Sequence, residues 1–264
     1  MADKETEQFP AEFIGSTMKI FTITVCLIAA AAGPGFALTL GSGSKTCPVC
    51  LEEVGYNTEI SATVFDTRLD FKPVGMVMAP DALPDCPKCG FVNFISSGTA
   101  RELAGYRAIT ASEEYRSRLG RSSYFRLAYL YEKLGRSGWD VGGTYLEASW
   151  QEEQQPEKLK EDLELALKHF DAHLPGFKEG SGDWLSVQLM RVELLRRLSR
   201  FDEAKKTLRS MRGQSFLKGS LGARVLKCER LLCRLEDPAP RAIGEMEKEF
   251  GLFGTIKNFF KGLL

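Results

Sequence analysis

The sequence predicts an α+β protein that is mostly α. Two observations predict this class. Four cysteines form two C-P-x-C pairs, Cys47-Pro48-Val49-Cys50 and Cys86-Pro87-Lys88-Cys89, and the segment between the pairs is rich in β-forming residues. From about residue 98 onward, apolar residues recur at helical spacing over several long segments. We therefore expect a small N-terminal unit with short antiparallel strands, followed by an array of α-helical hairpins.

The composition limits the classes of function. Of the 264 residues, 44% are hydrophobic and 27% are charged, which is typical of a globular protein. Lysine plus arginine and aspartate plus glutamate both number 35, so the chain has no overall charge bias toward nucleic acid. The sequence contains no phosphate-binding loop, dinucleotide fingerprint or serine-hydrolase elbow. We expect a protein that is neither an enzyme nor a nucleic-acid-binding protein.

Residues 1–37 have the pattern of a secretory signal peptide. The uncharged run at residues 20–32 is followed by Pro34 and by small residues suited to cleavage after Ala37. The run is shorter than the ~20 residues that span a bilayer. Acidic residues at the extreme N-terminus do not fit a signal peptide, and a translation start at Met18, which we expect, removes them. The prediction is an exported, periplasmic or extracellular protein; an uncleaved N-terminal membrane anchor is the alternative.

The two cysteine pairs predict a metal site. A thiolate pair on a tight turn offers two soft ligands about 2.3 Å from a tetrahedral ion, and a second such turn completes the shell. The proline inside each pair and the glycine after the second pair favour such turns. Because four sulfur ligands leave no open coordination position, one Zn²⁺ ion bound here would be structural. The predicted zinc ligands are Cys47, Cys50, Cys86 and Cys89.

Two other interpretations of these cysteines stay open. An exported protein meets an oxidising compartment, where the pairs could form disulfides. A thioredoxin-like redox dithiol is the other alternative, although a single C-x-x-C at the start of a helix would favour it, and here two pairs occur. The chain's seven cysteines are an odd number, which argues against a fully paired disulfide framework.

The predicted zinc ribbon covers residues 45–97 and follows a Gly/Ser linker at residues 38–44. Within it, residues 59–71 alternate between apolar and polar, with a shift at Phe65-Asp66, which indicates one bulged or broken strand; two strands are the alternative. Residues 75–78 are a second candidate strand.

The predicted helical domain covers residues 98–240. Ser112 or Thr110 could cap its first helix, and Asp183 a later one. The glycine-rich stretch at residues 138–143 departs from a regular helical array. The expected helices span residues 113–134 with a break at Gly120, and residues 145–151, 157–174, 184–198, 201–211 and 221–236.

Three segments of this domain resemble parts of tetratricopeptide (TPR) repeats. Residues 124–135 look like a first helix, residues 166–175 like a second helix with its terminal proline, and residues 194–204 like the turn between helices. The resemblance implies a TPR-like α-helical hairpin array whose concave face binds a peptide. We therefore expect a scaffold for an unknown protein partner.

The whole layout resembles an uncharacterised bacterial family, the domain of unknown function numbered 2225. Its members join a C-P-x-C…C-P-x-C-G ribbon to a TPR-like helical region. The resemblance rests on the two cysteine pairs with Gly90 and on residues 127–135, and it covers roughly residues 45–236. The chain departs from the family at Phe91-Val92, where an aromatic–alanine pair is usual, and in its signal-peptide pattern. The resemblance implies the architecture and a zinc site, and no activity.

Three further features have structural explanations. His169 and His173 lie four residues apart on a predicted helix, but no third ligand can be named, so exposed surface histidines are expected. Cys228 belongs to an apolar stripe and is expected in the core, and Cys233 is expected to be a free thiol. Residues 241–264 are predicted to form a C-terminal amphipathic helix that docks on the helical domain. Contact of residues 250–264 with a membrane surface or a partner is the alternative.

Overall fold

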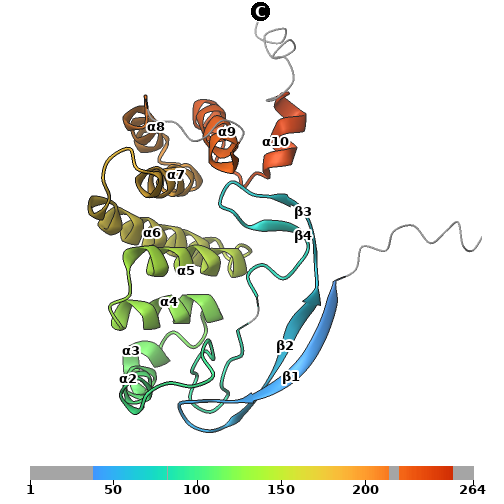
Figure 1. Cartoon of the computed structure of the whole chain (residues 1–264), viewed down its shortest axis with the longest axis vertical. Coiled ribbons are helices and arrows are strands. Elements are labelled where there is room, and N and C mark those ends of the chain that lie inside the picture. The colour runs from blue at the N-terminus through green and yellow to red at the C-terminus, as the bar shows by residue number, and fades with distance from the viewer. Residues whose placement is uncertain (1–37, 82, 214–219, 252–264) are drawn as a thin grey trace, which may run out of the picture. The chain divides into compact units, whose positions relative to one another are not determined.

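The computed structural model describes residues 38–81, 83–213 and 220–251 (Figure 1). The predicted signal peptide at residues 1–37 and residues 252–264 of the predicted C-terminal helix lie outside the described residues. The described residues belong to one compact unit. Within them, no helix combines the length and the apolar character needed to cross a bilayer.

The predicted α+β, mostly α class is confirmed. The strands are β1 (Thr39–Thr46), β2 (Glu53–Ser61), β3 (Thr63–Thr67) and β4 (Pro73–Met76). The helices are α2 (Ala100–Ala111), α3 (Glu113–Arg116), α4 (Ser123–Lys133), α5 (Gly138–Gln151), α6 (Pro156–His173), the 3-10 turn η1 (Leu174–Gly176), α7 (Gly182–Arg197), α8 (Phe201–Ser210), α9 (Leu221–Leu235) and α10 (Ile243–Phe250).

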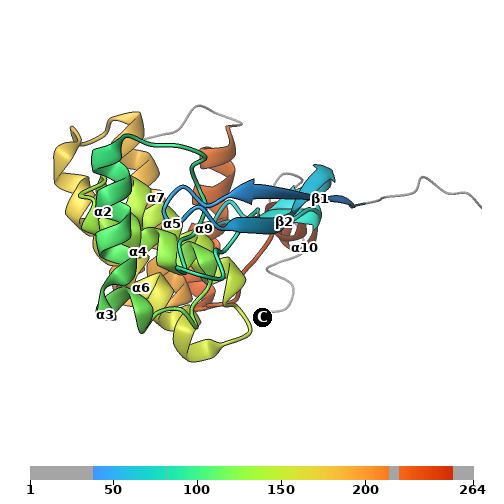
Figure 2. The ribbon, with the colours of Figure 1, turned by 90° about the horizontal axis from the view of Figure 1, so that it is seen from below.

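β1 and β2 form an antiparallel hairpin (Figure 2), and its turn carries the first cysteine pair. The predicted Gly/Ser linker at residues 38–44 is therefore wrong, because most of it belongs to β1. Cross-strand side chains cover the glycines of this strand. A Cβ atom on Gly41 would lie 2.8 Å from Ile60 Cδ1, and one on Gly43 would lie 3.0 Å from the Tyr56 ring. The glycines thus leave room for large neighbours on β2, which a reading of β1 alone does not reveal.

β3 and β4 form a second antiparallel hairpin, and their register shifts between Val64 and Asp66. The shift predicted at Phe65-Asp66 is confirmed, and it is a bulge in β3. This hairpin packs on the helices: Leu69 in its loop is fully buried in the helical core, and β3 contacts α10. The segment between the cysteine pairs therefore connects to the cysteine turns through β2 and packs on the helices through the β3–β4 hairpin.

Consecutive helices from α4 to α9 pack side by side, and Figure 1 shows α4 to α7 stacked in chain order. Their apolar faces form one continuous core, which follows from the 3.6-residue spacing of their apolar positions. The strong predicted helices at residues 157–174, 184–198, 201–211 and 221–236 agree with α6, α7, α8 and α9. The break expected at Gly120 lies between α3 and α4.

The starts of α7 and α2 differ from the prediction. α7 begins after Ser181, whose Oγ accepts a hydrogen bond from the Trp184 amide, so Asp183 lies inside the first turn and is not the cap. α2 was not expected. Thr99 and Glu102 form a capping box at its start, but only two of its residues, Tyr106 and Thr110, are buried, so it shows no apolar stripe.

α5 begins at Gly138, and the predicted start at residue 145 is wrong, because the whole glycine-rich stretch at residues 138–143 is helical. The glycines bring α5 close to α6. A Cβ atom on Gly138 would lie 2.7 Å from the carbonyl oxygen of His169, and one on Gly142 would lie 3.2 Å from that of Ala166. Glycine has a low helix propensity, but here the close packing of the two helices outweighs it.

Alanine substitutions at two glycines of α5 are expected to have opposite effects. Gly138→Ala places a methyl group against the α6 backbone, so we expect a loss of about 1–3 kcal/mol in the free energy of unfolding. Gly143→Ala has open space around the new methyl group and gains helix propensity, so we expect a gain of up to ~1 kcal/mol. Urea denaturation of both variants followed by circular dichroism checks the signs. Equal shifts would contradict the close contact between α5 and α6.

Candidate metal centre

The two cysteine turns have the same backbone hydrogen bonds. The amide of the first cysteine donates to the carbonyl five residues later: Cys47 to Glu52 (2.7 Å) and Cys86 to Phe91 (3.0 Å). In each turn the carbonyl of that cysteine accepts from the residue four positions on, Leu51 and Gly90, both at 2.9 Å. The C-P-x-C sequences therefore fold into a matched pair of tight turns.

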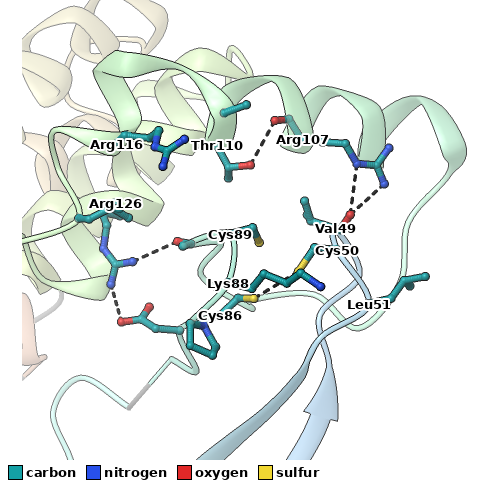
Figure 3. Close-up of a pocket in the computed structure, with 15 residues that line it drawn as sticks. Val49, Cys50, Leu51, Cys86, Lys88, Cys89, Arg107, Thr110, Arg116 and Arg126 are labelled. Atoms are coloured by element: carbon teal, nitrogen blue, oxygen red, sulfur yellow. Dashed lines mark hydrogen bonds and ion pairs between the residues drawn. The ribbon is translucent and has the colours of Figure 1, made fainter.

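The turns bring all four predicted ligands together, and Figure 3 shows Cys50, Cys86 and Cys89 converging from the two segments. Their Sγ atoms all lie within 4.8 Å of one another, close enough to hold one metal ion. The Sγ atoms of Cys47 and Cys89 are 3.7 Å apart, and those of Cys50 and Cys86 are 3.4 Å apart. A tetrahedron with bonds of about 2.3 Å has edges of roughly 3.8 Å, so the four sulfur atoms fit such a shell.

The backbone at the end of each turn is left-handed, with φ of 65° at Leu51 and 73° at Gly90. Leucine is strained in this conformation and glycine is not. Leu51 is 78% exposed, so its side chain contributes little burial in return.

Leu51→Gly is expected to leave the free energy of unfolding unchanged or to raise it by up to ~1 kcal/mol. The relief of left-handed strain offsets the greater entropy that glycine gives the unfolded chain. The reciprocal change Gly90→Leu introduces that strain, and its Cβ atom would also lie 2.5 Å from Leu119 Cδ2, so we expect it to cost about 2–3 kcal/mol. Thermal unfolding of the two variants at the same zinc concentration checks both predicted changes in stability. Strong destabilisation by Leu51→Gly would contradict the equivalence of the turns.

A layer of aromatic side chains lies beneath the turns. Phe91, directly after the second pair, is fully buried, and its ring centroid lies 5.4 Å from that of Tyr106 on α2 and 5.7 Å from that of Phe94. Tyr115 of α3 is also fully buried, and its hydroxyl donates to the Gly90 carbonyl (2.8 Å). Helices α2 and α3 therefore fix the metal centre in place.

Basic side chains hold the backbone of both turns. Arg107 of α2 donates from Nε (3.2 Å) and from a terminal nitrogen (2.8 Å) to the Val49 carbonyl in the first turn. Arg126 of α4 donates to the Gly90 carbonyl in the second turn at 3.1 Å (Figure 3). Four thiolates around a divalent ion leave two negative charges, which such neighbouring cations offset. These arginines could not be predicted from the sequence, because they lie far from the cysteine turns that they contact and belong to no motif.

Burial and hydrogen bonds from backbone amides shift the pKa of the cysteine thiols in opposite directions. Burial raises the pKa of Cys47, and backbone amides of Cys50 and Val49 only partly oppose it. Burial also acts to raise the pKa of Cys86, but hydrogen bonds from the backbone amides of Cys89 and Lys88 outweigh it, and the pKa of Cys86 is lowered. Burial raises the pKa of Cys89. A bound cation would favour the thiolate form of all four, since metal binding displaces thiol protons.

Other candidate residues are not part of this centre. In the described ranges, the cysteine quartet is the one group of histidine, cysteine and acidic residues with metal-ligand spacing. His169 stacks on Tyr145 with ring centroids 5.7 Å apart, and His173 packs edge-on against Phe177 at 4.8 Å. The expectation that these histidines are exposed is wrong, because both are half-buried.

Cys228 and Cys233 are free and lie in the helical core, as predicted for Cys228. Burial raises the pKa of Cys228 to about 11 and that of Cys233 to about 12. These two thiols are therefore protonated and inert near neutral pH.

Comparison of the chain with protein-family models, curated proteins and solved structures found no match. The resemblance to the family numbered 2225 therefore stays a prediction. The function has to be inferred from the geometry itself.

Proposed function

We propose that the protein is an exported zinc-binding protein in which one structural Zn²⁺ ion supports a TPR-like helical scaffold for protein–protein interaction. The observation that carries the zinc assignment is the convergence of four cysteine Sγ atoms within 4.8 Å on two matched turns. A set of four sulfur ligands suits zinc or an iron–sulfur cluster. Tight C-P-x-C turns that close around a single centre favour zinc.

The pattern of sulfur distances supports a metal over a redox dithiol. Each sulfur atom has a close neighbour in the other turn: the Sγ atoms of Cys47 and Cys89 are 3.7 Å apart, and those of Cys50 and Cys86 are 3.4 Å apart. A thioredoxin-like dithiol would pair within one C-x-x-C motif. Structural zinc leaves no coordination position for a substrate, so we propose no catalytic role for the centre.

The scaffold role is supported by the stack of α4 to α9, in which each helix packs mainly on its chain neighbours. Arrays of this kind expose a long, curved row of side chains that suits an extended partner. Export is proposed from the signal-peptide pattern of residues 1–37.

The test of the zinc assignment is metal content and thiol count, measured on the full chain and on the chain from residue 38, both purified without added metal. One zinc per chain, with the four cysteine thiols reactive only after chelation and denaturation, is the expected result. Metal-free protein with Cys47–Cys50 or Cys86–Cys89 disulfides would overturn it and make thiol–disulfide exchange the function to pursue. For export, residues 1–37 and residues 18–37 fused to a periplasmic reporter should both direct secretion.

A further inference from the structure

A cleft of about 1100 Å³ lies along the helix stack, away from the metal centre. α5, α6 and α7 line it, together with the β3–β4 loop and the start of α9. Large apolar side chains are exposed at this cleft: Trp139 is 43% exposed, Phe71 38% and Leu221 42%. Three such side chains around one hollow are unusual on a soluble surface, where apolar patches of this kind commonly mark interaction sites.

Phe71 is held in the cleft at a cost to the backbone. Its φ of 66° is left-handed, which is rare for a bulky residue. The residues before it anchor the loop: Leu69 is fully buried, and the carboxylate of Asp70 pairs with Arg68 and Arg197 and accepts from Trp150 Nε1 (3.1 Å). The surrounding contacts thus impose the strain on a half-exposed aromatic ring, and strain maintained in this way is concentrated at functional positions.

The cleft is also acidic. The carboxylates of Asp140, Glu147 and Asp183 line it, and no lysine or arginine does so among the described residues. The described residues offer none of these three carboxylates an ion-pair partner. Glu147 is half-buried, and its burial together with the charge of nearby Asp81 raises its pKa to about 7. Partnerless carboxylates beside exposed aromatic rings suit a ligand that is both cationic and apolar.

We propose that this cleft binds a segment of a partner protein that carries bulky apolar side chains and at least one lysine or arginine. The inference rests on the proposed scaffold function and names the surface and the chemistry of its partner. The cleft extends across α5, α6, α7 and the start of α9, which suits an extended peptide segment. Apolar side chains of the partner would cover Trp139 and Phe71, and its cation would lie beside Glu147.

The experiment selects phage-displayed random dodecapeptides that bind the full chain. The affinity of synthetic copies of the selected peptides is then measured by fluorescence anisotropy. Selected sequences are expected to combine aromatic or aliphatic residues with lysine or arginine. Glu147→Gln is expected to weaken their binding about fivefold to tenfold, which is the loss of one partly desolvated charge pair. Glu164→Gln, an exposed carboxylate of α6 outside the cleft, is the matched control and should leave the affinity unchanged.

Phe71→Gly separates a binding role from a structural one. Glycine relieves the left-handed strain, so the melting temperature should stay the same or rise, while the peptide affinity should fall at least tenfold. Leu40→Ala removes an apolar side chain that is 52% exposed on β1, and it should change neither quantity. A lower melting temperature with unchanged affinity would overturn the role assigned to Phe71.

The remaining outcomes distinguish the cleft from the scaffold function. Peptides that bind regardless of Glu147→Gln and Phe71→Gly would overturn the cleft assignment and leave the scaffold function standing. Selection of acidic peptides would overturn the proposed partner chemistry. If neither the full chain nor a chain ending at Gly251 selects any peptide, both the cleft assignment and the scaffold function are overturned. If a chain ending at Gly251 selects peptides and the full chain does not, the occupant is the chain's own residues 252–264, which carry Lys257 and Lys261 and no acidic residue. That result would overturn the proposal of a partner protein.

Discussion

Cys86→Ser is expected to lower the free energy of unfolding by on the order of 5 kcal/mol and to abolish stoichiometric zinc binding. Binding of zinc to a structural site contributes on the order of 10 kcal/mol, and this binding energy is coupled to folding. A domain has only about 5–15 kcal/mol of stability in total. Cys86 is 2% exposed and lies in the cluster that contains Phe91 and Tyr115, so an empty site would also loosen the packing of α2 and α3.

The measurement is thermal unfolding followed by circular dichroism, with metal content determined on the same samples. A chelator added to the wild-type chain should reproduce the effect of Cys86→Ser. Cys228→Ala is the control, because Cys228 is as deeply buried but lies in the helical core. It should cost about 1–2 kcal/mol and keep one zinc per chain. If Cys86→Ser melts no lower than Cys228→Ala, the metal does not support the fold.

The second large effect is expected from Arg196→Met, at about 3–5 kcal/mol of lost stability. The Arg196 side chain is fully buried between the carboxylates of Glu193 and Glu229, which are buried as well. It also donates to the carbonyls of Asp237 (2.6 Å) and Ala239 (2.8 Å), which fixes the segment after α9. Removing the cation that pairs with both carboxylates leaves buried negative charge poorly compensated, and this is costlier than the net value of the ion pairs.

Two comparisons make this prediction specific. Arg200→Met applies the same change to an exposed arginine paired with Glu203, and it should cost less than ~1 kcal/mol. Glu229→Gln should also cost little, because burial and the neighbouring Glu193 raise the pKa of Glu229, and the neutral acid resembles the amide. Urea denaturation of the three variants checks the order. A small effect of Arg196→Met, similar to that of Arg200→Met, would contradict the role of the buried arginine.

The sequence predicted those parts of the fold whose signal is local. α6 to α9 have clear apolar stripes, and the bulge at Phe65-Asp66 appears as a shift in the alternation. The cysteine quartet could be predicted because the ligand type and the spacing together specify one metal site. In each case the residues that form the sequence pattern are the same residues that form the structural feature.

The missed parts depend on neighbours distant in the chain. Gly138 reads as a helix breaker, and only the proximity of α6 explains why a glycine begins α5. Gly41 reads as part of a linker until the Ile60 side chain is found across the hairpin. Arg107 contacts the first cysteine turn from a helix more than 50 residues away, and no local pattern distinguishes it from other surface arginines. Contacts between residues distant in the chain produce no periodic pattern in the sequence, so they could not be predicted from it.

The β3–β4 hairpin affects how the protein unfolds. It is hydrogen-bonded to the segment at the start of α10: the Leu69 amide donates to the Arg241 carbonyl (3.0 Å), and the Gly244 amide donates to Asp66 Oδ1 (3.0 Å). A linear stack of helices can fray from its last repeat inward, one unit at a time. Here α10 cannot detach without also releasing the β3–β4 hairpin, whose loop is paired to Arg197 of α7. These contacts should make the stack melt as one cooperative unit, and a nascent chain cannot form them until α10 has been made.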